Sequence, residues 1–488
     1  MNYHHLHDAI VKHIPHSGGF ARNVAVLAGG TALGQGLVVV FAPLLSRLYS
    51  PADFGNLAIY SSVLSVLSVV VSLKYELAIP LPKEDSSAYS LMALSMLLAF
   101  VTTACVAGLM WGFGPSVVAW AGLPSFEGYL WLVPLGLFGT AIYQTLSYWS
   151  VRKKAFETIA RTKVRQNVGM VSVQLVTAFL AHGALGLLVG DIAGRFLGSG
   201  TLAGGLELEQ ARKTHWRDVR SVARTYARFP EVMLWAGLSN ILAMQIPFFL
   251  LPKFFLLEKV GMYFFAYRIL ALPVTLLSAA VSQVFFAEIA QASDSQKMRE
   301  TTQSVADLLL TIGLPLYLGL LVIGPRAFSL FFGVVWTGAG QYAVWLAPML
   351  ILRLVGSSLS SLLTVGGRYA EALFFTVVEL CTSIVCIWIA TVYNSIEAFL
   401  ISSMVFSIPL GVLSIWRFVR VAQLRTLRLL YDALFPIAPI NIFGFMLIWL
   451  GVVIFPPVPS IVIWLLVVFW VLYASLRMPH LRTTLSRL

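Results

Sequence analysis

The chain has 488 residues, of which 59% are apolar and only 11% charged, and its mean hydropathy is +0.85. This composition excludes a soluble globular protein. Because a helix that crosses the hydrocarbon core needs about 20 residues, the length allows about fourteen spans and leaves no room for a large soluble domain.

The positive charges that produce the net charge of +12 are sorted along the chain. Alternate gaps between apolar stretches, with their rims, contain 26 of the 33 Lys and Arg residues. The other gaps contain Arg47, Lys253, Lys259 and Arg326, and the apolar stretches themselves contain Arg195, Arg268 and Arg353. This alternation follows the positive-inside rule, so we predict a multi-pass membrane protein with its basic side cytoplasmic. The basic loops fit an anionic lipid surface as partner, and nucleic acid is not expected to bind.

The predicted elements begin after a cytoplasmic N-terminal tail, residues 1–22. This tail holds five of the eight histidines with no Cys and a single acidic residue, Asp8, which do not make a metal-ligand set, so we expect neither a metal site nor a cleavable signal peptide. The first six spans form an N-lobe, residues 23–204. They are expected at 23–46, 55–80, 87–113, 129–150, 161–182 and 184–204.

A basic inter-lobe linker, residues 205–229, separates the N-lobe from a C-lobe at 230–416. The six spans of the C-lobe are expected at 230–252, 260–286, 304–325, 339–364, 371–392 and 396–416. A basic loop (417–433), two appended spans within 434–476 and a C-terminal tail (477–488) complete the chain. The fold class predicted is therefore an all-α integral membrane protein of about fourteen transmembrane helices, with both termini cytoplasmic.

The two halves look related in sequence. The first span is followed by LYSPADFG, which closes at Gly55, and the seventh ends in FFLLEKVG, which closes at Gly261. An Ala-Gly pair precedes each closing glycine at nearly equal spacing. We predict a parallel repeat with a pseudo-two-fold axis, and chance similarity between apolar helices is the alternative.

Small residues and prolines inside the spans carry further predictions. Gly30 and Gly34 lie four residues apart, which favours close packing against another helix of the same bundle over dimerisation. Pro247 and Pro273 are hinge candidates because each removes a backbone donor within a helix. The three cysteines, Cys105, Cys381 and Cys386, are expected to be small core residues.

Arg195, Arg268 and Arg353 are expected at similar depth in spans 6, 8 and 10. A charge at mid-bilayer costs about 2.5–3.5 kcal/mol, so it normally faces protein or water. Guanidinium forks suit phosphate because they donate two parallel hydrogen bonds and stay charged. We therefore predict a cationic substrate-binding cavity, to which Tyr267 and Lys74 also contribute. Tyr267 is preferred for stacking on a bound ligand over Tyr60, Tyr143, Tyr148 and Tyr263 because it adjoins Arg268.

The alternative to such a cavity is internal neutralisation. Asp191 lies four residues before Arg195 on one helix face, and Glu379 is placed to pair with Arg353 across two spans. Lys74 and Glu76 near the end of span 2 form either an entry gate or plain interface anchors.

No catalytic residues, cofactor or metal are expected. GGTALGQG lacks the GK[ST] of a phosphate-binding loop and lies inside a span. Without a nucleotide site, energy for transport comes from an ion gradient or from withdrawal of the product. The ion-coupling candidates are Asp191, Glu379 and Glu76.

Several strings resemble the Wzx-type O-antigen and exopolysaccharide flippases of the multidrug/oligosaccharidyl-lipid/polysaccharide exporter superfamily. The resemblance covers most of 23–420 and lies in LSRLYSPADFGNLAIY, LKYELAIPLP, YARFPEV, GMYFFAYRILALPVTLLSAAVSQVFFAEIAQ and, more loosely, FFGVVWTGAGQYAVWLAPMLIL. It implies two six-helix lobes around a central cavity, two further helices and translocation of undecaprenyl-diphosphate-linked oligosaccharide. The implied partners are that glycan, membrane lipids, a polysaccharide polymerase and a chain-length regulator. Lipid II flippases also carry arginines on their first two helices, where this chain offers only Arg47 and Lys74, so lipid II itself is not the expected substrate.

Two other functions remain open. A multidrug exporter of the same superfamily would prefer an acidic cavity for cationic drugs, whereas three arginines against two carboxylates favour an anionic guest. A membrane glycan polymerase or ligase would carry a large periplasmic segment, and each periplasmic connection predicted here has at most about fifteen residues.

Overall fold

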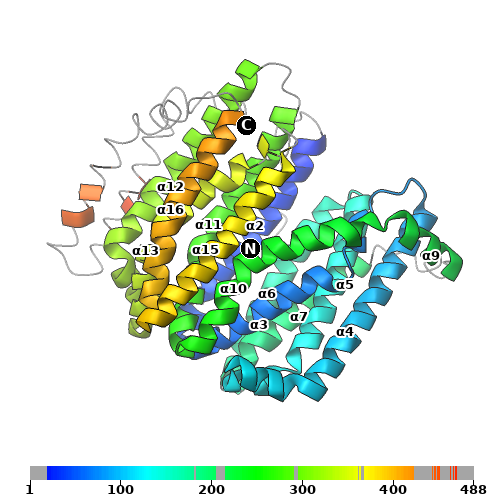
Figure 1. Cartoon of the computed structure of the whole chain (residues 1–488), viewed down its shortest axis with the longest axis horizontal. Helices are drawn as coiled ribbons and strands as arrows, with labels where there is room; N and C mark the ends of the chain where they lie inside the picture. Colours follow the sequence, from blue (N-terminus) through cyan, green and yellow to red (C-terminus); the bar gives the residue numbers. More distant parts are fainter. Residues whose placement is uncertain are drawn as a thin grey trace, which may run out of the picture. The chain divides into compact units, whose positions relative to one another are not determined.

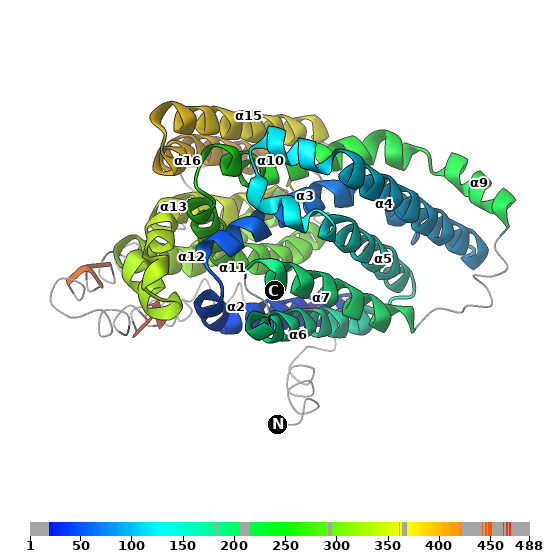
Figure 2. The same cartoon turned by 90° about the horizontal axis from the view of Figure 1, so that it is seen from below.

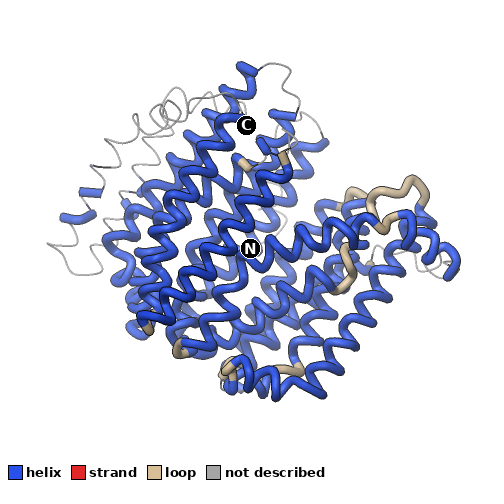
Figure 3. The backbone as a smooth tube through the Cα atoms, viewed as in Figure 1, coloured by secondary structure: helices blue, strands red, loops and turns tan. Residues whose placement is uncertain are grey.

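The structure is a computed structural model that describes residues 19–180, 183–204, 215–290, 295–360, 362–363 and 368–421, with isolated positions beyond 441. Within these ranges the chain is helical and contains no strand (Figure 3). It divides into two compact units, Met1–Gly261 and Met262–Leu488. Each unit is described by itself, and the predicted lobe boundaries stay predictions.

The described part of the first unit contains eight long helices and the first residues of α11 (Leu257–Ala290) (Figure 1). The helices are α2 (Gly19–Leu48), α3 (Pro51–Val70), α4 (Asp85–Ala121), α5 (Leu132–Arg152), α6 (Phe156–Leu180), α7 (Leu185–Ala203), α9 (Trp216–Thr225) and α10 (Leu234–Phe254). Short turns of helix join some of them: η1 (Tyr75–Ala78), η2 (Pro124–Tyr129) and η3 (Phe229–Met233).

Those residues of the second unit that the structure describes form the rest of α11 and four further long helices. They are α12 (Ser295–Phe332), α13 (Thr337–Leu359), α15 (Tyr369–Tyr393) and α16 (Ile396–Val421), and the short η4 (Val334–Trp336) leads into α13. Helix α13 packs against both α12 and α16, and α15 packs against α16.

Each of the first twelve predicted spans overlaps one of these helices. Nine helices in the described part of the chain are long and apolar enough to cross a membrane. Large apolar side chains such as Trp111, Phe179 and Trp388 are 91%, 79% and 64% exposed, which a soluble protein would not tolerate over so wide a surface. These observations confirm an all-α membrane protein. The two appended spans lie outside the described ranges.

The LYSPADFG string begins α3 through a capping box. Ser50 is the N-cap residue: its backbone N–H donates to the Asp53 carboxylate at 2.9 Å, and its hydroxyl accepts from the Asp53 backbone N–H at 3.3 Å. Pro51 occupies the first turn, where a helix loses no hydrogen bond by lacking an N–H. The motif thus sets where the second span starts.

Helix α3 ends at Val70, about ten residues before the predicted end of span 2. The prediction was wrong because Leu73 and Lys74 adopt positive φ values of 51° and 66°, which a continuous helix does not permit. Glu76 therefore lies in η1, beyond the candidate span Pro51–Val70.

Glycines allow close packing of three helices in the first unit. A Cβ atom on Gly34 of α2 would lie 3.1 Å from the Lys163 carbonyl oxygen of α6, so the predicted packing of Gly34 within one bundle is confirmed. Gly30 meets Ala160 of α6 in the same way. On α7, glycines recur every four residues and face Tyr49, Thr177 and α6; they are Gly186, Gly190, Gly194 and Gly198. Figure 2 shows α6 and α7 side by side, as expected from a helix face made of glycines.

Pro247 lies inside α10 and Pro273 inside α11, as the hinge hypothesis requires, and their role in motion stays a prediction. The expectation of core cysteines was wrong for Cys105 and Cys381, which are exposed, and right for the buried Cys386. A thiol is apolar enough to face lipid, which hydropathy does not distinguish from a core position. The histidine-rich tail lies outside the described residues.

Candidate functional site

Arg195 on α7 is held by its own helix and by α5. Its Nε donates to Asp191 Oδ2 at 2.7 Å and its Nη2 to Asp191 Oδ1 at 3.3 Å, so the guanidinium spans both carboxylate oxygens. Its Nη1 donates to Thr140 Oγ1 at 2.8 Å, and Thr140 in turn donates to the Gly136 carbonyl oxygen at 2.7 Å. The i,i+4 pairing named as the alternative is therefore realised, and both charges of the pair are neutralised internally.

Arg353 on α13 is held much more loosely, in the second unit. Its Nη1 donates to Tyr267 Oη at 3.2 Å and lies 3.8 Å from Glu379 Oε1. The Glu379 side chain is 49% exposed, against 20% for Asp191. Among the residues described, Nε and Nη2 of Arg353 have no hydrogen-bond acceptor, so one edge of the guanidinium fork stays available for a ligand.

Tyr267 and Arg268 lie next to each other on α11, where both side chains are partly exposed. The Tyr267 ring lies 6.3 Å from Tyr263, which is only 4% exposed and packs edge-on against Phe399 at 5.6 Å. Of the two rings, only Tyr267 is accessible to a sugar. The structure thus brings two predicted site residues, Tyr267 and Arg353, into direct contact, and Arg268 is the residue that follows Tyr267 in the chain.

Lys74 and Glu76 form a separate cluster at the η1 corner of the first unit. Glu76 is 1% exposed, accepts a hydrogen bond from Ser72 Oγ at 2.5 Å and lies 3.9 Å from Lys74 Nζ. Burial raises the pKa of the Glu76 carboxyl, and the Ser72 hydroxyl and the Lys74 ammonium lower it by less. The Lys74 stem lies beside α10, where a Cβ on Gly237 would be 3.4 Å from Lys74 Cε.

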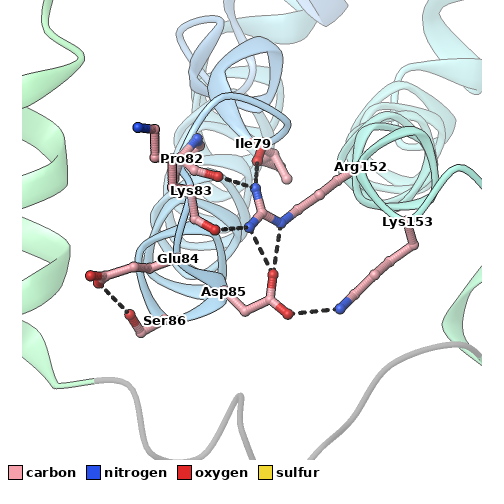
Figure 4. A network of polar contacts seen from close by, with 8 residues as sticks. All are labelled: Ile79, Pro82, Lys83, Glu84, Asp85, Ser86, Arg152 and Lys153. Atoms are coloured by element: carbon pink, nitrogen blue, oxygen red, sulfur yellow. Dashed lines mark hydrogen bonds and ion pairs between the residues drawn. The ribbon is translucent and has the colours of Figure 1, made fainter.

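The chain that follows η1 is clamped by α5 (Figure 4). Arg152 donates to the carbonyl oxygen of Pro82 at 2.5 Å and to Asp85 Oδ1 at 2.7 Å, and Lys153 donates to Asp85 Oδ2 at 2.8 Å. The YELAIPLP string therefore forms a fixed corner whose backbone carbonyls are bound by an arginine. Sequence reasoning missed this clamp, although a basic pair at the end of one helix and an acidic residue at the start of another were its visible signals.

Residues 44–341 match the family described as polysaccharide biosynthesis protein. The chain belongs to this family. One relative, the succinoglycan biosynthesis transport protein ExoT of Rhizobium meliloti (strain 1021), is 25% identical over 315 residues, which cover 62% of this chain and 60% of the relative. The aligned region thus spans less than two thirds of that protein.

Solved structures show the same fold at low identity. The lipid II flippase MurJ in an inward closed conformation has a TM-score of 0.68 and 14% identity, covering 92% of this chain and 97% of that one. An inward-facing multidrug resistance transporter of the MATE family has a TM-score of 0.61 and 14% identity, covering 85% and 97%. The predicted all-α membrane fold and the predicted kinship with polysaccharide exporters are confirmed, whereas the count of fourteen helices and the division into two six-helix lobes stay predictions. The predicted site residues are placed by their contacts alone, and their roles stay predictions.

Proposed function

We propose that the chain is a flippase that moves undecaprenyl-diphosphate-linked oligosaccharide from the cytoplasmic to the periplasmic leaflet by alternating access, for O-antigen or exopolysaccharide assembly. Membership of the polysaccharide biosynthesis family and the fold shared with a lipid II flippase support this proposal. The observation that carries it is the environment of Arg353: Nη1 donates to Tyr267, and among the described residues Nε and Nη2 have no acceptor.

The proposed chemistry at Arg353 is recognition of the diphosphate. A guanidinium binds phosphate oxygens through two parallel hydrogen bonds, and the Tyr267 ring beside it offers a stacking face for the first sugar. Arg268 adds positive charge on the same helix as Tyr267. Arg195 is assigned a structural role because Asp191 already occupies its fork. That Arg195 shares one cavity with Arg268 and Arg353 stays a prediction.

Glu379 is the carboxylate we propose for ion coupling at this site. It is half exposed and 3.8 Å from Arg353, so a proton gained or lost there changes the charge that faces the diphosphate. Asp191 is less suited because its oxygens already accept from Arg195. If E379Q keeps full transport with full sensitivity to a collapsed proton gradient, coupling through Glu379 is wrong.

The proposal is tested in cells of a strain that lacks the chromosomal gene. R353A and R268A are expected to abolish surface polysaccharide at wild-type protein level, whereas R161Q, which changes an exposed arginine of α6, is expected to keep it. The second candidate function is a multidrug exporter, which the fold match to a MATE transporter supports. Measurements of drug tolerance distinguish it from a flippase. Wild-type polysaccharide in R353A combined with lost drug tolerance would establish the exporter instead.

We further propose that the protein lies in the inner membrane with both termini on the cytoplasmic side. We also propose that it works in contact with a polysaccharide polymerase and a chain-length regulator. The sorted Lys and Arg residues support the orientation. Tags fused to either terminus and probed with an impermeant protease in spheroplasts are expected to be protected until the membrane is broken.

A further inference from the structure

Helix α9, within the basic stretch between α7 and α10, is docked on the first unit by one apolar face. Val219 and Val222 are 6% and 7% exposed and belong to a core cluster that includes side chains of η1, α4 and α5. Tyr75 of η1 donates its hydroxyl hydrogen to the Ala223 carbonyl oxygen at 2.9 Å. In both cartoon views α9 lies beside one end of α4 (Figures 1 and 2). The helix is therefore a fixed element and not a loose linker.

The opposite face of α9 is a row of arginines. Arg217, Arg220 and Arg224 are all exposed, and spacings of three and four residues place them on one side of a helix. Arg228 follows one turn later and is also exposed. The acidic residue within the helix, Asp218, lies 4.0 Å from His215. Among the described residues no carboxylate pairs with these four guanidiniums.

The level of α9 on α4 indicates what the arginines face. Leu91 and Leu94 of α4 are in the cluster that holds α9, whereas Leu97 and Phe100 are 40% and 62% exposed. Phe100 lies about 9 Å further along the helix than Leu94, at about 1.5 Å per residue. The arginine row thus begins about where the apolar, lipid-exposed surface of α4 ends. At that level a membrane presents its phosphate headgroups.

Trp216 supports the same location. It is 67% exposed at the start of α9, and exposed tryptophans are enriched at the boundary between lipid and water. A guanidinium fork binds two phosphate oxygens in parallel, and phospholipid headgroups at the membrane surface carry such phosphates.

We propose that α9 is a binding site for anionic phospholipid headgroups, which Arg217, Arg220 and Arg224 hold through their phosphates at the membrane surface. The site uses none of the residues proposed for the substrate and does not depend on the transported substrate. Lipid bound there holds α9 at the membrane surface, and with it the η1 corner that carries Lys74 and Glu76, to which Tyr75 links α9. The proposal therefore predicts that both lipid binding at α9 and the rate of transport depend on the fraction of anionic phospholipid in the membrane.

The test uses the purified full-length protein in nanodiscs of phosphatidylcholine with or without phosphatidylglycerol. Phosphatidylglycerol retained after detergent extraction is counted by native mass spectrometry. The triple variant R217Q/R220Q/R224Q is compared with K154Q/R161Q/R165Q, which removes three exposed charges from the α5–α6 turn and α6. The α9 triple variant is expected to bind phosphatidylglycerol about a hundredfold more weakly, and the control triple variant to bind as the wild type does.

Two outcomes overturn the proposal. Equal loss in both triple variants would mean diffuse attraction without a site on α9. Unchanged phosphatidylglycerol binding in the α9 triple variant, with polysaccharide lost in cells, would mean that the arginines serve a protein partner. If the triple variant does not fold, the single variants R217Q, R220Q and R224Q decide, because each removes only an exposed side chain and is expected to weaken binding about fivefold.

Discussion

Gly55 and Gly261 lie backbone against backbone where α3 and α11 begin. A Cβ atom on Gly261 would lie 2.7 Å from the Gly55 amide nitrogen and still closer to the Pro51 carbonyl oxygen, and a Cβ on Gly55 would lie 2.5 Å from the Leu257 carbonyl oxygen. These are the two glycines that close the predicted repeat motifs. Matching positions of the two halves therefore meet in one contact that excludes any larger residue.

G261A is expected to lower the free energy of unfolding by about 1–3 kcal/mol, because the added methyl group has only backbone atoms around it. The matched control is G108A on α4, where a Cβ meets nothing within 4 Å, and it is expected to be neutral or slightly stabilising. Thermal unfolding of the purified proteins measures both. An equally stable G261A would show that the two helices separate readily at this point.

The Arg195–Asp191 pair yields a prediction about stability. R195A leaves the Asp191 carboxylate partly buried without its partner and is expected to cost up to about 3 kcal/mol, since the side chains are 26% and 20% exposed. The double variant R195Q/D191N, which removes both charges, is expected to recover most of that loss. Unfolding midpoints in one detergent provide the comparison. Recovery of stability without recovery of transport would assign the pair a role in transport and contradict the structural assignment.

Y267F tests whether Tyr267 positions Arg353. The variant removes one hydrogen bond to a charged group and keeps the ring, so it is expected to lower transport severalfold and stability by about 1–2 kcal/mol. R353K keeps the charge without the fork and is expected to transport less than Y267F does. Initial rates of glycan appearance at the outer leaflet give both numbers. Transport by R353K at the wild-type rate would exclude bidentate recognition.

The buried Glu76 predicts a pH dependence of stability. Its pKa is raised in the folded protein, so the folded state binds more protons than the unfolded state between the two pKa values, and stability falls as the pH rises through that window. E76Q cannot lose a proton and is expected to be more stable than the wild type at neutral pH, with a difference that shrinks as the pH falls toward 4.5. Melting curves over that pH range, with the exposed E157Q as control, test the sign.

Hydropathy and charge predicted the all-α membrane fold because lipid imposes one length and one polarity on each helix that crosses it, and nine of the described helices meet that requirement. The i,i+4 spacing of Asp191 and Arg195 also disclosed their pairing. The early end of α3 could not be foreseen, because it depends on positive φ at Leu73 and Lys74, residues that rarely adopt it.

Two missed features did have signals in the sequence. Glycines at every fourth position of α7 indicate a helix face that packs closely against a neighbouring helix. Val219 and Val222 lie opposite three arginines in the helical pattern, which indicates an amphipathic helix within the predicted linker, residues 205–229. The sequence could not show that Arg195 is fully paired whereas Arg353 is not, because each arginine has a carboxylate within reach.

The central claim is that Arg353 holds the diphosphate of a lipid-linked glycan during translocation. Its most direct measurement uses proteoliposomes loaded with polyprenyl-diphosphate-linked oligosaccharide extracted from cells that lack this protein, with an impermeant lectin outside to capture glycan that crosses. Wild-type protein is expected to deliver glycan to the lectin, and correctly folded R353A to deliver none above empty liposomes. Delivery by R353A at the wild-type rate would contradict the account.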